Sequence, residues 1–216
     1  PSRADERDIG NWEFLLHHLA ERAGIWVSPY QRQRFNSDHY TFLSKRFDRT
    51  AKGRVHFASA LTLLGRQDGY DASQGASYLE LAEVLVRQGA QTDRDLEQLW
   101  RRIVFNVCVS NVDDHMRNHG FLLTPAGWEL SPAYDMNPDP MGDGLKLNIS
   151  EADNTQDLDL VMEVAPYFRL QGERAKVVMA EVLTGVREWR MEAQELGFEK
   201  GDTENMSPSF RGLSRA

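Results

Sequence analysis

Asp113, Asn118 and Asp135 have the side-chain types and the order that transfer of a phosphoryl group requires. Asp113 and Asn118 lie five positions apart in the densest polar stretch of the chain, and Asp135 follows after another 17 positions (135 − 118 = 17). Such transfer needs one carboxylate to orient the acceptor hydroxyl, and an amide oxygen and a second carboxylate for Mg²⁺. Mg²⁺ accepts hard oxygen ligands and keeps some waters, so one Asn and one Asp suffice beside the phosphates. A solvated turn is the alternative, because Asp and Asn are common loop residues.

Rigid elements are predicted on both sides of this polar stretch, residues 110–119, which is called the polar loop. Ser77 and Glu80 form a capping pattern that opens one helix, and Thr92 with Asp95 can open the next, whose apolar stripe runs to Cys108. Residues 120–130 then alternate around a Thr-Pro-Ala-Gly turn, which predicts a hairpin. The order of loop, hairpin and aspartate is that of a kinase catalytic loop and its metal-binding residue.

The flanking sequence predicts further elements. Helical spacing indicates an amphipathic helix over residues 11–24, capped by Asn11, with His17 on its surface. Strand-like stretches on either side of residues 36–38 predict a hairpin that ends near Phe47. A last helical pattern runs from about residue 172 to 196, and residues 201–216 are expected to form a frayed tail.

Composition excludes several classes of protein. The chain has 216 residues, 41% of them hydrophobic and 27% charged, with a formal net charge of −8. This balance opposes a broad electrostatic hold on nucleic acid or anionic lipid, and no apolar run is long enough for a membrane span. The single cysteine, Cys108, cannot form an internal disulfide and is expected to be a buried, inert thiol. A cytoplasmic location is expected, without membrane association.

Several motifs in a fixed order resemble one family. They are Pro1–Asp5 (PSRAD), Arg46–Arg49 (RFDR), Arg54–His56 (RVH), the run from Phe105 to Asn118, and Ser131–Asp135 (SPAYD). The chain resembles the HipA-like bacterial serine/threonine kinases, which are toxins of toxin–antitoxin modules. The resemblance covers nearly all of residues 1–200. It implies an α+β, bilobal protein-kinase-like fold, with residues 1–75 in the smaller lobe and hinge, 76–200 in a helical catalytic lobe and 201–216 as a flexible tail.

The resemblance also implies a role for each matching residue. Asp113 resembles the catalytic base, and Asn118 and Asp135 resemble the Mg²⁺ ligands of a site for Mg²⁺ and ATP. The other residues expected to bind nucleotide are those of the hinge, whose backbone faces the adenine, and of the nucleotide-facing loop: Lys45, Arg46, Phe47, His115, Arg117 and Tyr134.

Parts of the family pattern are missing from this sequence. The phosphate loop and the strand lysine that hold ATP in the family lie upstream of the segment that matches Pro1, so the smaller lobe is expected to be incomplete. Lys45 is an alternative for that lysine, because it lies in a predicted strand, but the match places it at the hinge. The resemblance implies a helix-turn-helix antitoxin as partner, which would contact DNA in place of the kinase. By analogy the protein substrate is an aminoacyl-tRNA synthetase.

Two other functions remain open at this point. His115 and His119 lie four positions apart, so on a helix both imidazoles would share a face and hold Zn²⁺ for a metal-dependent hydrolase. Against this, Met116 stands where the H-E-x-x-H motif has its Glu. A kinase-derived binding module without catalysis is the second alternative, and nucleotide binding separates it from an enzyme.

Overall fold

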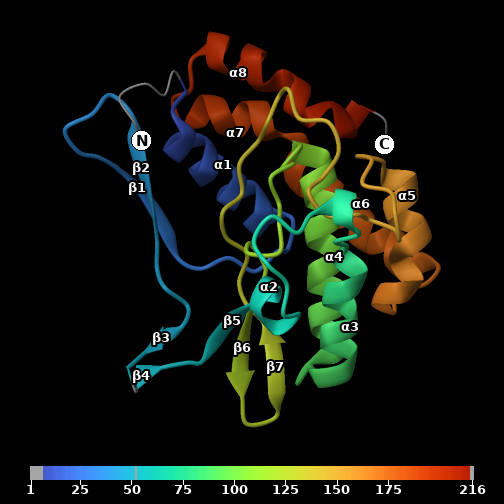
Figure 1. Cartoon of the computed structure of the whole chain (residues 1–216). Coiled ribbons are helices and arrows are strands. Elements are labelled where there is room, and N and C mark those ends of the chain that lie inside the picture. Colours follow the sequence, from blue (N-terminus) through green and yellow to red (C-terminus); the bar gives the residue numbers. More distant parts are fainter. Residues whose placement is uncertain (1–6, 52, 215–216) are drawn as a thin grey trace.

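The computed structural model describes residues 7–51 and 53–214, so the Pro1–Asp5 motif lies outside the described residues. Helices and strands are both present (Figure 1), and the strands form two two-stranded sheets and one three-stranded sheet. The helices are α1 (Ile9–Arg22), α2 (Ala60–Leu63), α3 (Tyr78–Gln88), α4 (Thr92–Val109), α5 (Leu158–Val164), α6 (Glu173–Arg187), α7 (Trp189–Glu195) and α8 (Lys200–Met206). Short 3₁₀ helices are η1 (Ala72–Gln74), η2 (Ala165–Phe168) and η3 (Ser207–Ser214). The strands are β1 (Tyr30–Arg34), β2 (Tyr40–Ser44), β3 (Arg49–Thr50), β4 (Gly53–Arg54), β5 (Phe57–Ser59), β6 (Gly120–Thr124) and β7 (Gly127–Leu130).

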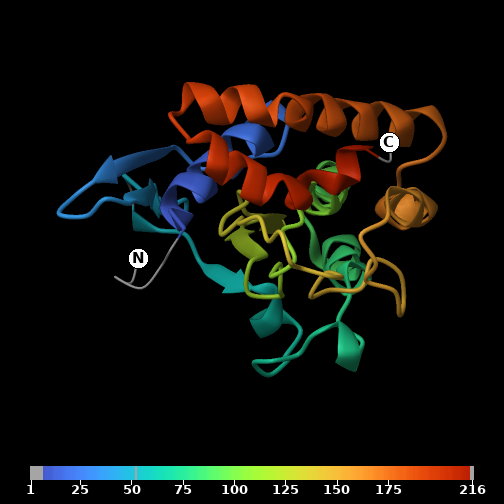
Figure 2. The same cartoon turned by 90° about the horizontal axis from the view of Figure 1, so that it is seen from above.

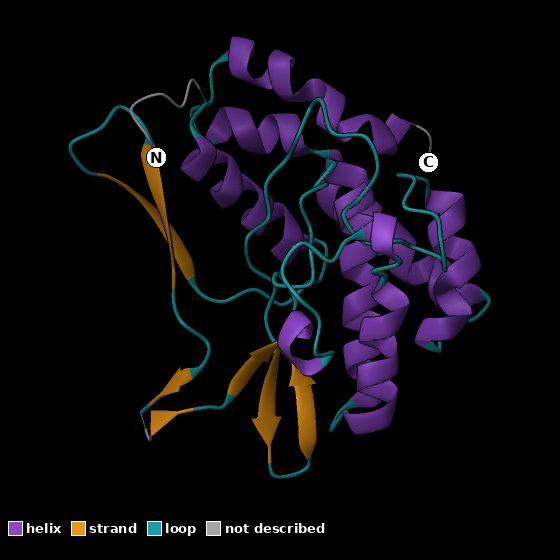
Figure 3. Ribbon diagram, in the orientation of Figure 1, coloured by secondary structure: helices purple, strands orange, loops and turns teal. Residues whose placement is uncertain are grey.

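Helix α4 is the centre of the core (Figures 1 and 3). Its apolar stripe, including Trp100 and Phe105, is fully buried, and Cys108 is buried with it as expected. The prediction that Thr92 caps this helix is wrong, because the Thr92 hydroxyl donates to Leu85 O at 3.1 Å, at the end of α3. The predicted capping box of α3 is confirmed.

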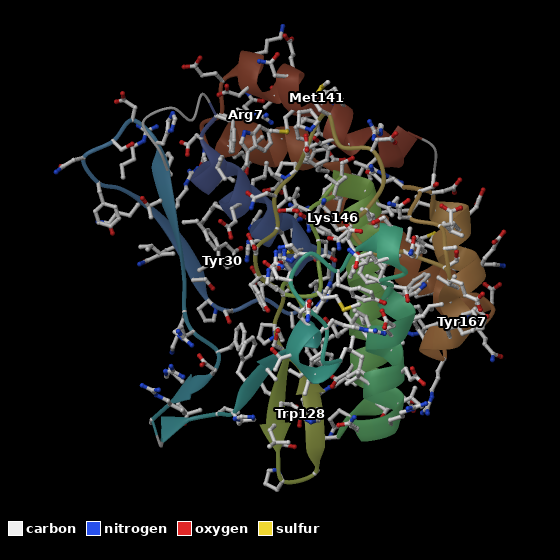
Figure 4. All side chains as sticks on the ribbon, in the orientation of Figure 1. Arg7, Tyr30, Trp128, Met141, Lys146 and Tyr167 are labelled. Carbon is white, nitrogen blue, oxygen red and sulfur yellow. The ribbon has the colours of Figure 1, made fainter. Side chains whose placement is uncertain are left out.

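The N-terminal helix α1 packs against the β1–β2 hairpin that was predicted, in antiparallel register. The helix begins at Ile9, and its cap is Asp8 rather than Asn11, because the Asp8 carboxylate accepts the Asn11 N–H at 3.2 Å. Gly10 permits the close approach to β2, since a Cβ at this position would lie 2.2 Å from Tyr40 O. Figure 4 labels Tyr30 of β1, whose ring lies 5.2 Å from the ring of Phe14 on α1.

A three-stranded sheet joins the two regions that the sequence divides near residue 75. The predicted β6–β7 hairpin is present, and β5 pairs antiparallel with β6, from Phe57 with Leu122 to Ser59 with Gly120. The segment after the β3–β4 turn therefore belongs to the same sheet as the hairpin that follows the polar loop. This long-range pairing was not visible in the sequence, because β5 is three residues long.

The C-terminal helices lie along α1 and α4 (Figure 2). The predicted helix over 172–196 is two helices, α6 and α7, which meet at Glu188. The expectation of a frayed tail is wrong for residues 200–214, which form α8 and η3. Met206 and Phe210 are buried there, and the Phe210 ring stacks on Trp189 at 3.8 Å. Among the described residues, no helix is both long and apolar enough to cross a membrane.

His17 was expected on the surface of its helix, but the structure buries it completely between α1 and the hairpin. Its ring lies 4.4 Å from the ring of Phe42, and Nδ1 donates to Glu13 O at 2.9 Å. No described residue offers a partner to the buried Nε2. Burial lowers the pKa of His17 to about 4 from 6.5, because the charged imidazolium would be desolvated.

We expect His17 to make the stability of the chain depend on pH. Its pKa is depressed on folding, so its contribution is fully present above about pH 6.5 and is lost as the pH falls toward 4. The shift corresponds to about 3 kcal/mol. Urea unfolding from pH 7 to 4.5 should therefore show a smaller loss of stability in His17→Met than in the wild type, and no such difference in His56→Gln, an exposed control. If the free energy of unfolding falls equally with pH in the wild type and in His17→Met, this account is contradicted.

Candidate active site

The polar loop after α4 has a fixed path. Ser110 ends the helix in the left-handed conformation, with φ 47°, and its carbonyl accepts Asp139 N–H at 3.0 Å. Farther along, Met116 O accepts Leu61 N–H at 3.3 Å, and His119 O accepts Ala60 N–H at 2.8 Å. The loop is thus tied to the segment 134–146 on one side and to α2 on the other.

Asn118 brings the three expected site residues together. Its side-chain Nδ2 lies 3.4 Å from both Asp113 O and Asp135 O. Both contacts are with carbonyl oxygens, so the amide must turn its NH₂ group toward them and its Oδ1 the other way. No described residue donates to that Oδ1, which leaves it available to a cation.

Asp135 has an unusual backbone and a perturbed carboxyl. Its φ of 58° lies in the left-handed region, which residues other than Gly, Asn, Asp and His rarely adopt. The residue is accessible to solvent, but the protein around the carboxyl still removes part of its hydration, and this raises the pKa. The negative charge of Asp113 acts in the same direction, and His115 opposes it.

The carboxyl of Glu13 on α1, which the sequence did not reveal as part of the site, interacts electrostatically with Asp135. Burial, together with the charge of Asp135, raises the pKa of Glu13 to about 7. The charge of Asp135 thus acts on Glu13, and His115 and Arg117 partly offset the negative charges around Asp135. Carboxylate and amide oxygens are ligands that divalent cations accept, and the Asn118 Oδ1 is such a neutral oxygen. These oxygen donors fit Mg²⁺, which Asn118 and Asp135 would hold as predicted from the sequence.

The predicted hinge residues line a cavity of about 380 Å³. The ring of Phe47 lies 5.7 Å from that of Tyr134 and 5.8 Å from that of Phe57, so three aromatic rings surround the space. Lys45, Arg46 and Arg117 complete the wall with Ser44 and Asp48. Flat apolar walls of this kind suit a heteroaromatic base.

The hinge backbone offers groups that such a base could bind. Lys45 N–H is used by Pro29 O at 2.8 Å, but the main-chain N–H and C=O groups of Arg46 and Phe47 have no hydrogen-bond partner within the described residues. The Arg46 guanidinium donates twice to the Asp48 carboxylate, at 2.8 and 2.7 Å, and this fixes the turn that follows. The cavity and its free amides therefore fit an adenine.

A second cavity of about 540 Å³ lies on the other side of Asp113. Its lining includes Asp113, Asp71, Asp139 and Asp143, together with Lys146, which is labelled in Figure 4. Asp113 lines this second cavity and Arg117 lines the aromatic one, so residues of the polar loop contribute to both cavities.

The remaining predicted residues support the loop. Tyr134 donates its hydroxyl to Arg117 O at 2.6 Å, and Arg117 pairs with Asp68. His119 is buried, with Nε2 2.8 Å from Asp114 Oδ2, whereas His115 acts on Asp135. The His119 imidazole thus interacts with Asp114 and the His115 imidazole with Asp135. Within the described part of the chain, no three His, Cys, Asp or Glu side chains are grouped to hold a metal, which counts against the hydrolase alternative.

The sequence did not reveal the buried hydrogen bonds that hold the polar loop to the helices. Asp114, next to Asp113, is buried and accepts hydrogen bonds from Tyr78 of α3 and Asn106 of α4. The pattern Asn106-Asn111-Asp114 inside and just after an apolar helix was the available signal, because polar residues on a buried stripe need partners.

Comparison with known proteins decides the family. The family model described as the HipA-like C-terminal domain matches residues 2–190. The chain belongs to this HipA-like family. The resemblance expected from the motifs is thereby confirmed.

Two relatives from Sinorhizobium fredii agree with this assignment. The protein named "Putative kinase Y4mE" is 28% identical over 132 residues, which cover 57% of this chain and 31% of the relative. "Putative kinase Y4dM" is 35% identical over 97 residues, which cover 43% of this chain and 22% of the relative. The chain thus spans a third or less of the length of these relatives.

Solved structures confirm a kinase-like fold of mixed helix and sheet. HipA of the Shewanella oneidensis toxin–antitoxin system, solved with HipB and operator DNA, superposes with a TM-score of 0.75 at 18% identity, covering 97% of this chain and 55% of HipA. The Helicobacter pylori proinflammatory kinase CtkA superposes with a TM-score of 0.64 at 11% identity, covering 97% of this chain and 80% of CtkA.

Removal of an aromatic wall should weaken adenine binding. We expect Phe47→Ala in the full-length protein to lower ATP affinity about tenfold, because stacking of a base on an aromatic ring is worth about 1–3 kcal/mol. Phe35→Ala changes a phenylalanine that is 59% exposed and should leave the affinity unchanged. Calorimetric titration with ATP measures both, and equal affinities for the two variants would remove the aromatic cavity from the nucleotide site.

Proposed function

We propose that the protein containing this chain is an ATP-dependent serine/threonine protein kinase. The observation that carries the proposal is the position of Asp113 and Asn118 on a loop between an aromatic cavity and an acidic one, with Asp135 beside them. This arrangement separates a place for the nucleotide from a place for the acceptor. The kinase-like fold supports it.

Each group of residues has one role in the proposed transfer. The hinge backbone at Arg46 and Phe47 orients the base, and the aromatic rings exclude water from it. Asn118 and Asp135 would hold Mg²⁺, which when bound neutralises charge on the phosphates. Asp113 accepts the proton of the acceptor hydroxyl and aligns that oxygen for attack. Positioning and charge neutralisation are most of what this reaction needs from a protein.

The acceptor is proposed to enter through the acidic cavity beside Asp113. Asp71, Asp139 and Asp143 line this space, and one lysine, Lys146, lines it with them. A negative wall repels a polyanion, so a nucleic acid or a phosphorylated metabolite is a poor acceptor here. A hydroxyl on a serine or threonine of a protein suits the site better.

The proposal extends to a partner. A helix-turn-helix antitoxin, as implied by the family and by the presence of HipB in the HipA complex, would carry the DNA contact, in agreement with the charge of −8 on this chain. By analogy, an aminoacyl-tRNA synthetase is proposed as the protein substrate. The binding module without catalysis is the second candidate function, and it predicts that the protein does not bind nucleotide.

The decisive variants are Asp113→Ala and Asp135→Ala in the full-length protein. Asp113→Ala should lower the rate of γ-phosphoryl transfer by about 100-fold or more while Mg-ATP binding stays within a few fold, because general-base catalysis typically contributes that much. Asp135→Ala should weaken Mg-ATP binding itself by about tenfold or more, because it removes a metal ligand. Radiolabelled ATP transfer and nucleotide titration separate the two effects.

Asp159→Ala is the matched control, since Asp159 is an exposed aspartate on α5. Its transfer rate and Mg-ATP affinity should equal those of the wild type. Full transfer by Asp113→Ala would remove the assignment of the base, and Mg-ATP binding unchanged by Asp135→Ala would remove the assignment of the metal ligand.

A further inference from the structure

The carboxylate of Asp114 is the meeting point of three elements. One oxygen, Oδ2, accepts hydrogen bonds from the Tyr78 hydroxyl at 2.6 Å and from Asn106 Nδ2 at 2.8 Å, and His119 Nε2 lies 2.8 Å from it. These partners come from the first residue of α3, from α4, and from the residue before β6. Asp114 is 4% exposed, and Tyr78 is fully buried.

The electrostatics show that Asp114 is charged in this network. Burial alone would raise its pKa, but the charge and hydrogen bond of His119, the hydrogen bond of Tyr78 and the charge of Arg102 outweigh burial and lower it. Conversely, burial and the charge of Asp114 raise the pKa of Tyr78 well above 10, so its hydroxyl remains a donor. A buried carboxylate with several donors is held in one position.

The network continues toward the metal-binding segment. Asn106 Oδ1 accepts Asn111 Nδ2 at 3.0 Å, and Asn111 Oδ1 accepts the main-chain N–H of Asn137 at 3.1 Å. Asn137 lies two residues after Asp135. A continuous path of hydrogen bonds, buried as far as Asn111, therefore runs from Asp114, next to the proposed base, to the backbone that carries the proposed metal ligand.

We propose that Asp114 is a positioning residue for phosphoryl transfer, which fixes Asp113 relative to Asp135 through the hydrogen-bonded path of Asn106, Asn111 and Asn137. The inference rests on the proposed kinase function. The buried side chain of Asp114 lines neither cavity, so we assign its effect on the reaction to the orientation of Asp113, in addition to the effect of its charge on Asp135. A half-satisfied network is costly, so loss of the charge should loosen the loop while the helices stay packed.

The test compares Asp114→Asn with Asp95→Asn in the full-length protein. Asp95 is equally buried on α4, but its carboxylate accepts Leu130 N–H at 2.9 Å and pairs with Arg94, away from the loop. Both variants lose a buried carboxylate of the same core. Transfer rates are corrected for the folded fraction measured by thermal unfolding.

Asp114→Asn is expected to lower kcat by about 10- to 100-fold, with KM for ATP within about threefold, because misplacement of a reacting group by about 1 Å costs that much. Asp95→Asn should retain kcat within about twofold. An unchanged kcat in Asp114→Asn, or an equal fall in both variants, would overturn the positioning role.

Amide hydrogen exchange gives a readout that does not depend on activity. Residues 112–118 should exchange at least tenfold faster in Asp114→Asn than in the wild type, and at the wild-type rate in Asp95→Asn. If the wild-type protein transfers no phosphate while Asp114→Asn still loosens residues 112–118, the proposed kinase function is contradicted. The anchoring of the loop by Asp114 would still hold in that case. Exchange that is unchanged in residues 112–118 would overturn the inference itself.

Discussion

The buried carboxylate of Asp114 is the interaction on which the site depends. It joins the start of α3, the end of α4 and the approach to β6 through donors from Tyr78, Asn106 and His119. A carboxylate in this position is stable only while its partners stay in place, because an unpaired buried charge costs several kcal/mol. The loop that carries Asp113 and Asn118 is consequently held by the core.

Two carboxyl groups near the candidate site, those of Glu13 and Asp135, have raised pKa values. Desolvation raises the pKa values of Glu13 and Asp135, the charge of Asp135 adds to the rise at Glu13, and the charges of Asp113 and Asp114 add to the rise at Asp135. Under the proposed function, a divalent cation bound with a nucleotide would offset this negative charge, and the aromatic cavity at the hinge would hold the base. The kinase-like fold thus supplies a polar cluster and an apolar cavity from different parts of one chain.

Local signals in the sequence were enough for several elements. The capping box at Ser77, the period of α4 and the turns of both hairpins are short-range patterns, and the structure contains all of them. Long-range contacts were not predictable: β5 pairs with β6 across more than 60 residues, and η3 is ordered because Phe210 stacks on Trp189. The spacing of Asp113, Asn118 and Asp135 indicated the site, but Glu13 and Asp114 matter through tertiary contacts that no spacing reveals.

A crystal structure of the full-length protein with Mn²⁺ and a non-hydrolysable ATP analogue tests the central claim most directly, because Mn²⁺ replaces Mg²⁺ and is located by its anomalous scattering. The account predicts an Mn²⁺ ion within about 2.3 Å of Asn118 Oδ1 and of an Asp135 carboxylate oxygen, with the adenine between Phe47 and Tyr134. The γ-phosphate should face Asp113. An ion bound away from Asn118 and Asp135, or an adenine outside the aromatic cavity, would contradict it.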